Sequence, residues 1–324
     1  MIGEAVRIDL PLPADKPFDV VGLGVNVINH LSVLERFPEP DTKVDAVEVT
    51  QQGGGVVATA MVTCARLGLR TKYMGKMGTD HWGRASWETL LREGIDLADS
   101  VVDQAERTRV TVGLVEGGSG RRTLIRDPVR PARLRPEDLS PPAVTCGRVL
   151  HLDGYEGPAA VQAARWAREA GIPVSLDAEE ATECRDALFA LTDILIVARR
   201  FGEALTGAKD VPGILERLER LGPRVVGLTL GADGSVIRSR GTTTYAEGYK
   251  VEVEDTTGAG DVFHGAFLAG LLWGWPLPDI LRLANAVAAL KCRRLGGQAG
   301  IPTLAETRTF LKALGVELPS VQAG

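Results

Sequence analysis

The stretch VEVEDTTGAGDVFHGAFLAGLL, residues 251–272, carries the most structural information in this sequence. Its pattern predicts a strand at 251–254, a turn of small residues, and an apolar helix over about 259–273. Small residues at a helix start leave backbone N–H groups uncovered, and the helix dipole adds partial positive charge there. The junction at 255–261 therefore predicts an anion site suited to a phosphoryl group.

Asp261 lies in the first turn of that helix, beside the predicted anion site. A carboxylate there can accept the proton of a hydroxyl that attacks a phosphate, while the amides hold the developing charge. A lone acidic residue at a helix start often does no more than complement the dipole. The full glycine-rich pattern around Asp261 favours the catalytic interpretation.

Outside this stretch, short apolar strands alternate with helices along most of the chain. The strands are predicted at 19–25, 71–75, 148–154, 173–178, 192–197, 224–231 and 235–239, and the remaining helices at 56–67, 82–92, 158–170, 278–294 and 303–313. Such alternation predicts a three-layer α/β/α fold, in which helices cover both faces of a mostly parallel central sheet.

Two parts of the chain break this rhythm. Residues 43–50 alternate between apolar and polar side chains, as do 108–116 and 121–126, and the last two are joined by the hairpin signal GGSG. Their half-exposed pattern predicts a small separate sheet that acts as a lid or a dimer surface. The polar, proline-rich residues 1–17 are expected to form a loose N-terminal arm.

The overall composition excludes several classes of protein. The chain has 324 residues, of which 44% are hydrophobic and 24% charged, a balance that excludes intrinsic disorder. Its 37 basic and 42 acidic residues give a net charge of −5, which argues against a nucleic-acid partner. The densest basic run is interpreted as a solvated loop; its members are Arg121, Arg122, Arg126, Arg130, Arg133 and Arg135.

The sequence also gives no sign of a membrane or metal-thiolate protein. The longest apolar stretch, around 263–275, is too short for a membrane span and contains glycines. The N-terminus lacks a signal-peptide pattern, so we expect a cytoplasmic protein without a membrane partner. The four cysteines show no metal-site or redox spacing and are expected to be small hydrophobic residues.

With these motifs in view, the sequence resembles the PfkB or ribokinase-like family of sugar kinases over nearly its whole length. The segment at 255–261 resembles the strongest signature of that family, which implies Asp261 as the catalytic base and the amides of Gly258, Ala259 and Gly260 as the anion hole. Residues 53–55 resemble the sugar-side diglycine motif, and residues 227–235 and 284–302 resemble the nucleotide-binding turn and the adenine-side helix and loop.

The resemblance implies a ribokinase-like core over 18–313, with lid strands inserted at about 30–52 and 106–127 and a tail at 314–324. It implies ATP and Mg²⁺ as cofactors, a small sugar as substrate, and a homodimer formed through the lid. The implied substrate-binding residues are Asn29, Gly54, Gly55, Thr59 and Asp261. The implied nucleotide-binding residues are Thr229, Gly231, Gly234, Thr257, Gly258, Gly260, Asn285 and Ala288.

A monovalent cation such as K⁺ often lies beside the anion hole in this family. Asp255 and Thr257 match two of its ligands, so the resemblance implies them as a potassium site.

Three positions depart from the family pattern. Asn29 stands where the sugar-binding Asp is usual, and Thr59 stands where an Asn is usual. The Asn-x-x-Glu motif that orders magnesium is absent from 198–203, so Mg²⁺ is expected to be held by phosphates and water. Arg199 or Arg200 meets phosphate directly, or both are surface charges. These departures resemble the ketohexokinase-like and sulfofructose-kinase-like branches.

The sequence therefore predicts an ATP-dependent kinase that phosphorylates a primary hydroxyl of a small sugar or sugar derivative. Two alternatives stay open. One is a nucleoside kinase, which a stacking aromatic residue in the lid segments 43–50 and 108–126 would favour, and those two segments contain none. The other is a sugar- or nucleotide-binding sensor without turnover, which the missing Asn-x-x-Glu motif suggests and the intact Asp261 opposes.

Overall fold

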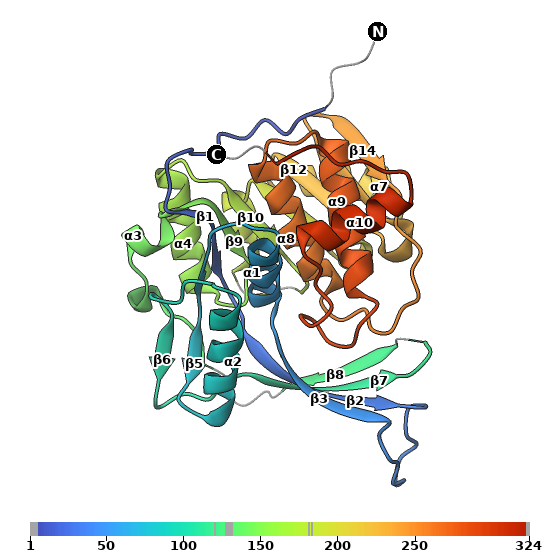
Figure 1. Ribbon diagram of the computed structural model, residues 1–324. Coiled ribbons are helices and arrows are strands. Elements are labelled where there is room, and N and C mark those ends of the chain that lie inside the picture. Colours follow the sequence, from blue (N-terminus) through green and yellow to red (C-terminus); the bar gives the residue numbers. More distant parts are fainter. Residues whose placement is uncertain (1–5, 120, 127–131, 181, 183, 322–324) are drawn as a thin grey trace.

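The computed structural model describes residues 6–119, 121–126, 132–180, 182 and 184–321, and within them the chain forms three layers around a central sheet (Figure 1). The central sheet has eight strands: β1 Phe18–Leu23, β4 Thr71–Met74, β9 Gly147–Leu152, β10 Val174–Asp177, β11 Ile194–Ala198, β12 Val225–Thr229, β13 Ser235–Ser239 and β14 Thr242–Ala246. Their order is β14-β13-β12-β11-β10-β9-β1-β4. Every neighbouring pair from β12 to β4 is parallel, whereas β13 and β14 add an antiparallel edge.

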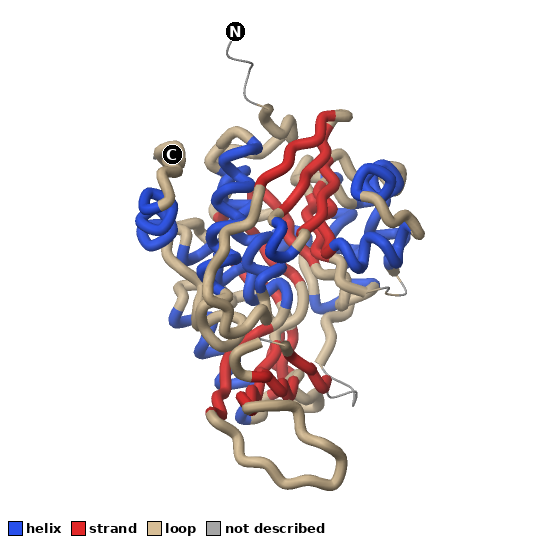
Figure 2. Tube along the Cα trace, turned by 90° about the vertical axis from the view of Figure 1, so that its right-hand side faces the viewer, coloured by secondary structure: helices blue, strands red, loops and turns tan. Residues whose placement is uncertain are grey.

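Helices cover both faces of this sheet, which confirms the predicted α/β class (Figures 1 and 2). The helices are α1 Val56–Arg66, α2 His81–Arg92, α3 Pro141–Val144, α4 Pro158–Glu169, α5 Arg185–Leu191, α6 Arg199–Thr206, α7 Val211–Glu219, α8 Ala259–Leu272, α9 Leu277–Lys291 and α10 Leu304–Ala313, with 3₁₀ turns η1 Pro136–Asp138 and η2 Gly231–Asp233. One core lies between the sheet and α1, α8 and α9, and a second lies between the sheet and α4, α5 and α7.

The strand sequences explain why the sheet is buried on both faces. Successive side chains of a strand point to opposite faces. Val20 of β1 belongs to the first core, whereas its neighbour Val21 belongs to the second. Strands with two covered faces appear as continuous apolar runs, as β1 and β11 do. Chain order reverses at β1, which pairs with β4 on one side and β9 on the other, so the carboxyl ends of β1 and β9 form a switch point.

Helix α8, which carries Asp261, is buried almost all round. Its close approach to α1 depends on Gly265, because a Cβ atom there would lie 2.6 Å from the carbonyl oxygen of Ala60. A helix that is apolar on every side belongs in a protein interior. This packing fixes the position of the N-terminal turn of α8 at the carboxyl end of the sheet.

A small separate sheet forms the predicted lid, seen below the core in Figure 1. Its strands are β2 Val27–Leu34, β3 Glu48–Gly54, β7 Val110–Glu116 and β8 Arg122–Arg126, in the order β3-β2-β7-β8. Strands β7 and β8 pair antiparallel, as the hairpin signal predicts. Leu31 and Val115 are buried against Leu295 of the core, so their face of the lid points inward. Two short strands, β5 Lys76–Gly78 and β6 Val101–Asp103, pair separately.

Three local predictions are wrong. Residues 251–254 form no strand, because the Glu254 and Asp255 N–H groups donate to the Cys292 carbonyl instead of joining the sheet. The strand predicted over 43–50 begins only at Glu48, where pairing with the end of β2 begins. The N-terminal segment from residue 6 is not loose, since Leu10 is buried against the core.

Residues 1–5 of the expected arm, Asp127 and Arg130 near the lid, and residues 322–324 of the tail lie outside the described residues. No helix among the described residues is both long and apolar enough to cross a membrane.

Candidate active site

The N-terminal turn of α8 has the geometry of an anion site. Gly258 is the residue before the helix and has φ 76°, a left-handed conformation that favours glycine. A Cβ atom on Gly260 would meet no heavy atom within 4 Å, so its backbone faces open space. The first N–H groups of a helix have no intrahelical acceptor. Of the three predicted amides, that of Ala259 donates to the Thr256 carbonyl at 3.3 Å, which leaves Gly258 and Gly260 as the better placed donors.

Asp261 is 8% exposed and shares this end of the sheet with other carboxylates. Burial raises its pKa well above the usual range, and the nearby charges of Glu179 and Asp177 raise it further. The guanidinium of Arg122 acts in the opposite direction. Burial and the Asp177 charge also raise the pKa of Glu179, to about 7. A cluster of this kind binds protons readily and attracts cations.

The fold explains why these carboxylates meet. Asp177 is the last residue of β10 and Asp153 follows β9, so the two come from adjacent carboxyl ends of the sheet. Asp153 accepts hydrogen bonds from the Val25 N–H at 2.7 Å and the Tyr155 N–H at 3.0 Å. Burial raises its pKa to about 7. Ligands of open α/β sheets bind at this edge, outside the strand ends at the switch point.

One oxygen of Asp177 is a distinctive feature of this cluster. Among the described residues, its buried Oδ2 has no hydrogen-bond donor, although His264 Nε2 lies 3.4 Å away. His264 is itself 2% exposed and lies one turn after Asp261 on α8. A buried carboxylate oxygen without a donor is a position where a bound cation or its water shell would fit.

The predicted substrate-side residues meet between the lid and α1. Asn29 is 5% exposed on the inward face of β2. A Cβ atom on Gly54 would lie 2.1 Å from Asn29 Nδ2, and one on Gly55 would lie 2.4 Å from the Val25 carbonyl oxygen. The diglycine therefore permits β2 and the start of α1 to approach closely. Thr59 is 1% exposed on α1 and accepts a hydrogen bond from Gln298 Nε2 at 3.4 Å.

The predicted nucleotide-side residues lie on β12, the turn after it, and α9. Thr229 ends β12, and Gly231 and Gly234 have φ 63° and 101° in the following turn. Asn285 does not point freely outward, because its Nδ2 donates to the carbonyls of Ala246 and Glu247, both at 3.1 Å. Ala288 lies one turn further along α9 and is partly buried against the core.

Several charged residues of this site, the carboxylates Asp153 and Asp177 among them, were not predicted from the sequence. Arg122, assigned to a solvated loop cluster, lies on the inward face of β8 and donates to Thr256 Oγ1 in the glycine-rich segment. Arg126 lies four residues later in the sequence and on the same face of β8, and it pairs with both carboxylate oxygens of Glu180 at 2.9 and 3.1 Å. The period-two pattern of 121–126 contained this signal, since it places Arg122 and Arg126 on one face. Glu179 was likewise not singled out.

The position of the absent Asn-x-x-Glu motif is occupied by the start of α6. Arg199 and Arg200 are both exposed there, and Arg199 Nε pairs with Glu203 Oε1 at 2.9 Å. This pair is an ordinary i,i+4 contact on a helix surface. The geometry supports the interpretation of both arginines as surface charges.

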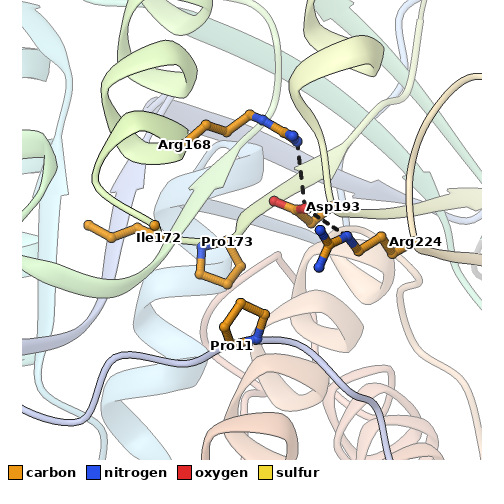
Figure 3. Close-up of a pocket in the computed structure, with 7 residues that line it drawn as sticks. Pro11, Arg168, Ile172, Pro173, Asp193 and Arg224 are labelled. Carbon is orange, nitrogen blue, oxygen red and sulfur yellow. Dashed lines mark ion pairs between the residues drawn. The ribbon is translucent and has the colours of Figure 1, made fainter.

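A pocket of about 110 Å³, drawn in Figure 3, is lined by Pro173 and Asp193, which directly precede β10 and β11, so it lies at the amino ends of these strands. Asp193 precedes β11 and accepts a hydrogen bond from the Val174 N–H at 3.0 Å. Arg168 and Arg224 flank the same carboxylate at 3.6 and 3.9 Å. These contacts tie together the amino ends of neighbouring strands.

Comparison with known proteins agrees with this geometry. The pfkB family of carbohydrate kinases matches residues 19–304. An ATP-dependent ribose-1-phosphate kinase from Halopiger xanaduensis is 28% identical over 86% of this chain and 93% of its own length. A fructokinase from Klebsiella pneumoniae is 31% identical over 77% of this chain and 88% of its own.

Solved structures show the same fold. A ribokinase from Arabidopsis thaliana, solved with ribose and ATP, superposes with a TM-score of 0.79 at 25% identity, covering 91% of this chain and 99% of that one. The glycine-rich start of α8, the buried Asp261 and the lid over the strand ends thus occur in a chain that belongs to the pfkB family of carbohydrate kinases.

Proposed function

We propose that this protein transfers the γ-phosphoryl group of ATP to a primary hydroxyl of a small sugar or sugar derivative. The observation that carries the proposal is the placement of the buried carboxylate of Asp261 directly at the open, glycine-rich N-terminus of α8. Its relatives include kinases of ribose 1-phosphate and fructose, which supports a sugar as the acceptor.

The reaction follows from the positions of these groups. A carboxylate oxygen of Asp261 accepts the proton of the substrate hydroxyl as its oxygen forms a bond to the γ-phosphorus. The bond between that phosphorus and the β–γ bridging oxygen breaks, and ADP leaves. The N–H groups of Gly258 and Gly260 stabilise the negative charge on the transferring group. The nucleotide extends toward the turn after β12 and α9.

Magnesium fits the acidic cluster beside this anion site. Bound to ATP, Mg²⁺ neutralises charge on the β- and γ-phosphates. The buried Oδ2 of Asp177 and the carboxylate of Glu179 would hold its water shell, in the role that the absent Asn-x-x-Glu motif has elsewhere in the family.

We also propose that the lid closes over the sugar and pairs with a second copy. Asn29 on the inward face would contact the sugar hydroxyls, and closure would exclude water from the phosphoryl group. The outward face carries exposed Val49, Val112 and Ile125, at 70%, 41% and 54%. Val112 and Ile125 are direct neighbours in the register, and Val49 lies on the same face across β2, so a homodimer formed through this face would bury all three apolar side chains.

ADP release with Mg·ATP, measured over a panel of acceptors, tests the proposed function. The panel contains ketoses, aldoses, sugar acids, phosphorylated and sulfonated sugars, and nucleosides. We expect turnover on a sugar and a loss of at least about a hundredfold in kcat in Asp261→Asn. Turnover on nucleosides alone would favour a nucleoside kinase. ATP binding without turnover on any acceptor would favour a sensor.

A further inference from the structure

Lys291, the last residue of α9, is buried directly behind the anion site. Its side chain is 0% exposed, and its Nζ donates a hydrogen bond to the backbone carbonyl of Asp255 at 2.8 Å. Burying an ammonium group is costly unless neighbouring oxygens compensate. Burial lowers the pKa of Lys291, and the negative charge of Asp255 opposes that change. The cost of burying this ammonium group suggests that its charge has a role in the neighbouring anion site.

The residues that were expected to bind a monovalent cation already have partners. Oδ1 of Asp255 accepts hydrogen bonds from Thr257 N at 2.8 Å and from Thr257 Oγ1 at 2.7 Å. Oδ2 accepts a hydrogen bond from Gly296 N at 2.8 Å. The Asp255 carbonyl, an oxygen of the kind that K⁺ would take, is used by Lys291. A K⁺ ion on these oxygens would lie beside the Lys291 ammonium, which already binds the Asp255 carbonyl, and the two positive charges would repel each other. Asp255 and Thr257 therefore fit a potassium site poorly in this chain.

The positive charge of the Lys291 ammonium group lies where it can replace the charge of a bound monovalent cation. Asp255 is followed within three residues by Gly258, at the start of α8. The charges that act on Lys291 include Asp261 and Arg122, so the ammonium lies within electrostatic range of the catalytic end of the helix. A fixed positive charge in a buried site acts strongly, because the interior screens it less than water does.

We propose that Lys291 is the built-in cation of this site. Its ammonium group holds the Asp255–Gly258 segment in the shape that presents the anion hole, and adds its charge to the field that binds the nucleotide phosphates. The protein consequently needs no added monovalent cation. Lys291 is a positioning residue here, since it acts through the backbone of Asp255, and the proposal rests on the proposed kinase function.

The test compares salts of constant ionic strength, with tetramethylammonium or K⁺ as the monovalent cation. Two quantities are measured for the full chain: the thermal unfolding temperature without ligand, and the affinity for ATP by calorimetry. We expect the wild-type protein to show the same values in both salts. A saturable rise of the unfolding temperature or of ATP affinity with K⁺ would overturn the proposal, and this measurement needs no variant.

Lys291→Met supplies the second arm, and Lys72→Met is its matched control. Lys72 is also buried, at 4% exposure, but pairs with Asp96 and Asp99 away from Asp261. Both variants should unfold at lower temperature. Only Lys291→Met should lose ATP affinity, by about tenfold or more, because it removes the buried charge behind the phosphate site and the hydrogen bond that holds Asp255. ATP affinity equal to wild type in Lys291→Met would contradict the proposal.

The two proposals fail in different ways. A wild-type protein that binds ATP but phosphorylates no acceptor would contradict the kinase function. The effect of K⁺ on the unfolding temperature and on ATP affinity would still test the role of Lys291. A wild-type protein that phosphorylates a sugar only when K⁺ is present would contradict the role of Lys291 and leave the kinase function intact.

Discussion

At the scale of single residues, Asp261, the proposed catalytic base, lies in an environment that destabilises its charged form. Burial and the charges of Glu179 and Asp177 raise its pKa, so the folded state disfavours the ionised form that the proposed mechanism requires. A group whose pKa is raised in the folded state binds more protons there than in the unfolded chain. Its contribution to the free energy of unfolding is therefore full in acid and is lost as pH rises above the ordinary carboxyl pKa.

This linkage predicts a gain of stability on removing the charge. Asp261→Asn should raise the free energy of unfolding at neutral pH relative to wild type, and the gain should shrink below about pH 4, where the wild-type carboxyl is protonated in both states. Denaturant unfolding of both proteins over a range of pH checks this. A variant that is less stable than wild type at neutral pH would show that Asp261 is favourably paired, against the present account.

At the scale of elements, β8 joins the lid to two segments at the carboxyl end of the central sheet, the one before α8 and the one after β10. Arg122 contacts Thr256 on the anion-site side, whereas Arg126 contacts Glu180 beyond β10. The Arg126–Glu180 pair is 63% and 44% exposed, so it contributes no more than about 1 kcal/mol. Arg122 differs because its charge acts on the buried carboxyl of Asp261. The two arginines should therefore affect different kinetic quantities.

Arg122→Gln should shift the acid limb of the kcat/KM profile to higher pH. The reason is that Arg122 lowers the Asp261 pKa, and its loss lets that pKa rise. Arg126→Gln, on the same face of the same strand, is the control. It should leave the limb in place and change KM for the sugar by no more than about fivefold. Equal shifts of the limb in both variants would argue against a specific role for Arg122.

Sequence patterns predicted the sheet, the lid and the start of α8 because each rests on local information. Each of these signals, whether an apolar run, a hairpin glycine or the 255–261 junction, determines the structure of only the few residues around it. The partners of Lys291 and Arg122 could not be predicted in this way. Those contacts join residues 36 and 134 positions apart, and only the packing of α9 and the lid on the core brings them together. The failed strand at 251–254 has the same cause, since its N–H groups donate to Cys292.

At the scale of the whole molecule, the exposed apolar side chains on the outward face of the lid lead us to expect a homodimer. Light scattering should give a mass near twice 34.5 kDa for the wild-type protein. The double variant Val49→Glu, Ile125→Glu should be monomeric, because it places charges on the apolar side chains that the proposed dimer would bury. Val102→Glu, at a 49% exposed position on β6, is the matched control and should remain dimeric. A wild-type monomer at micromolar concentration would contradict the lid-mediated dimer.

Phosphoryl transfer that depends on Asp261 can be followed with phosphorus NMR. Wild-type protein and Asp261→Asn are each incubated with Mg·ATP and the best acceptor of the panel. We expect the wild type to convert the γ-phosphate signal into that of a sugar phosphomonoester, with matching growth of ADP, and Asp261→Asn to do so at least about a hundredfold more slowly. Equal rates of product formation in the two proteins, or release of inorganic phosphate without any phosphomonoester, would contradict this expectation.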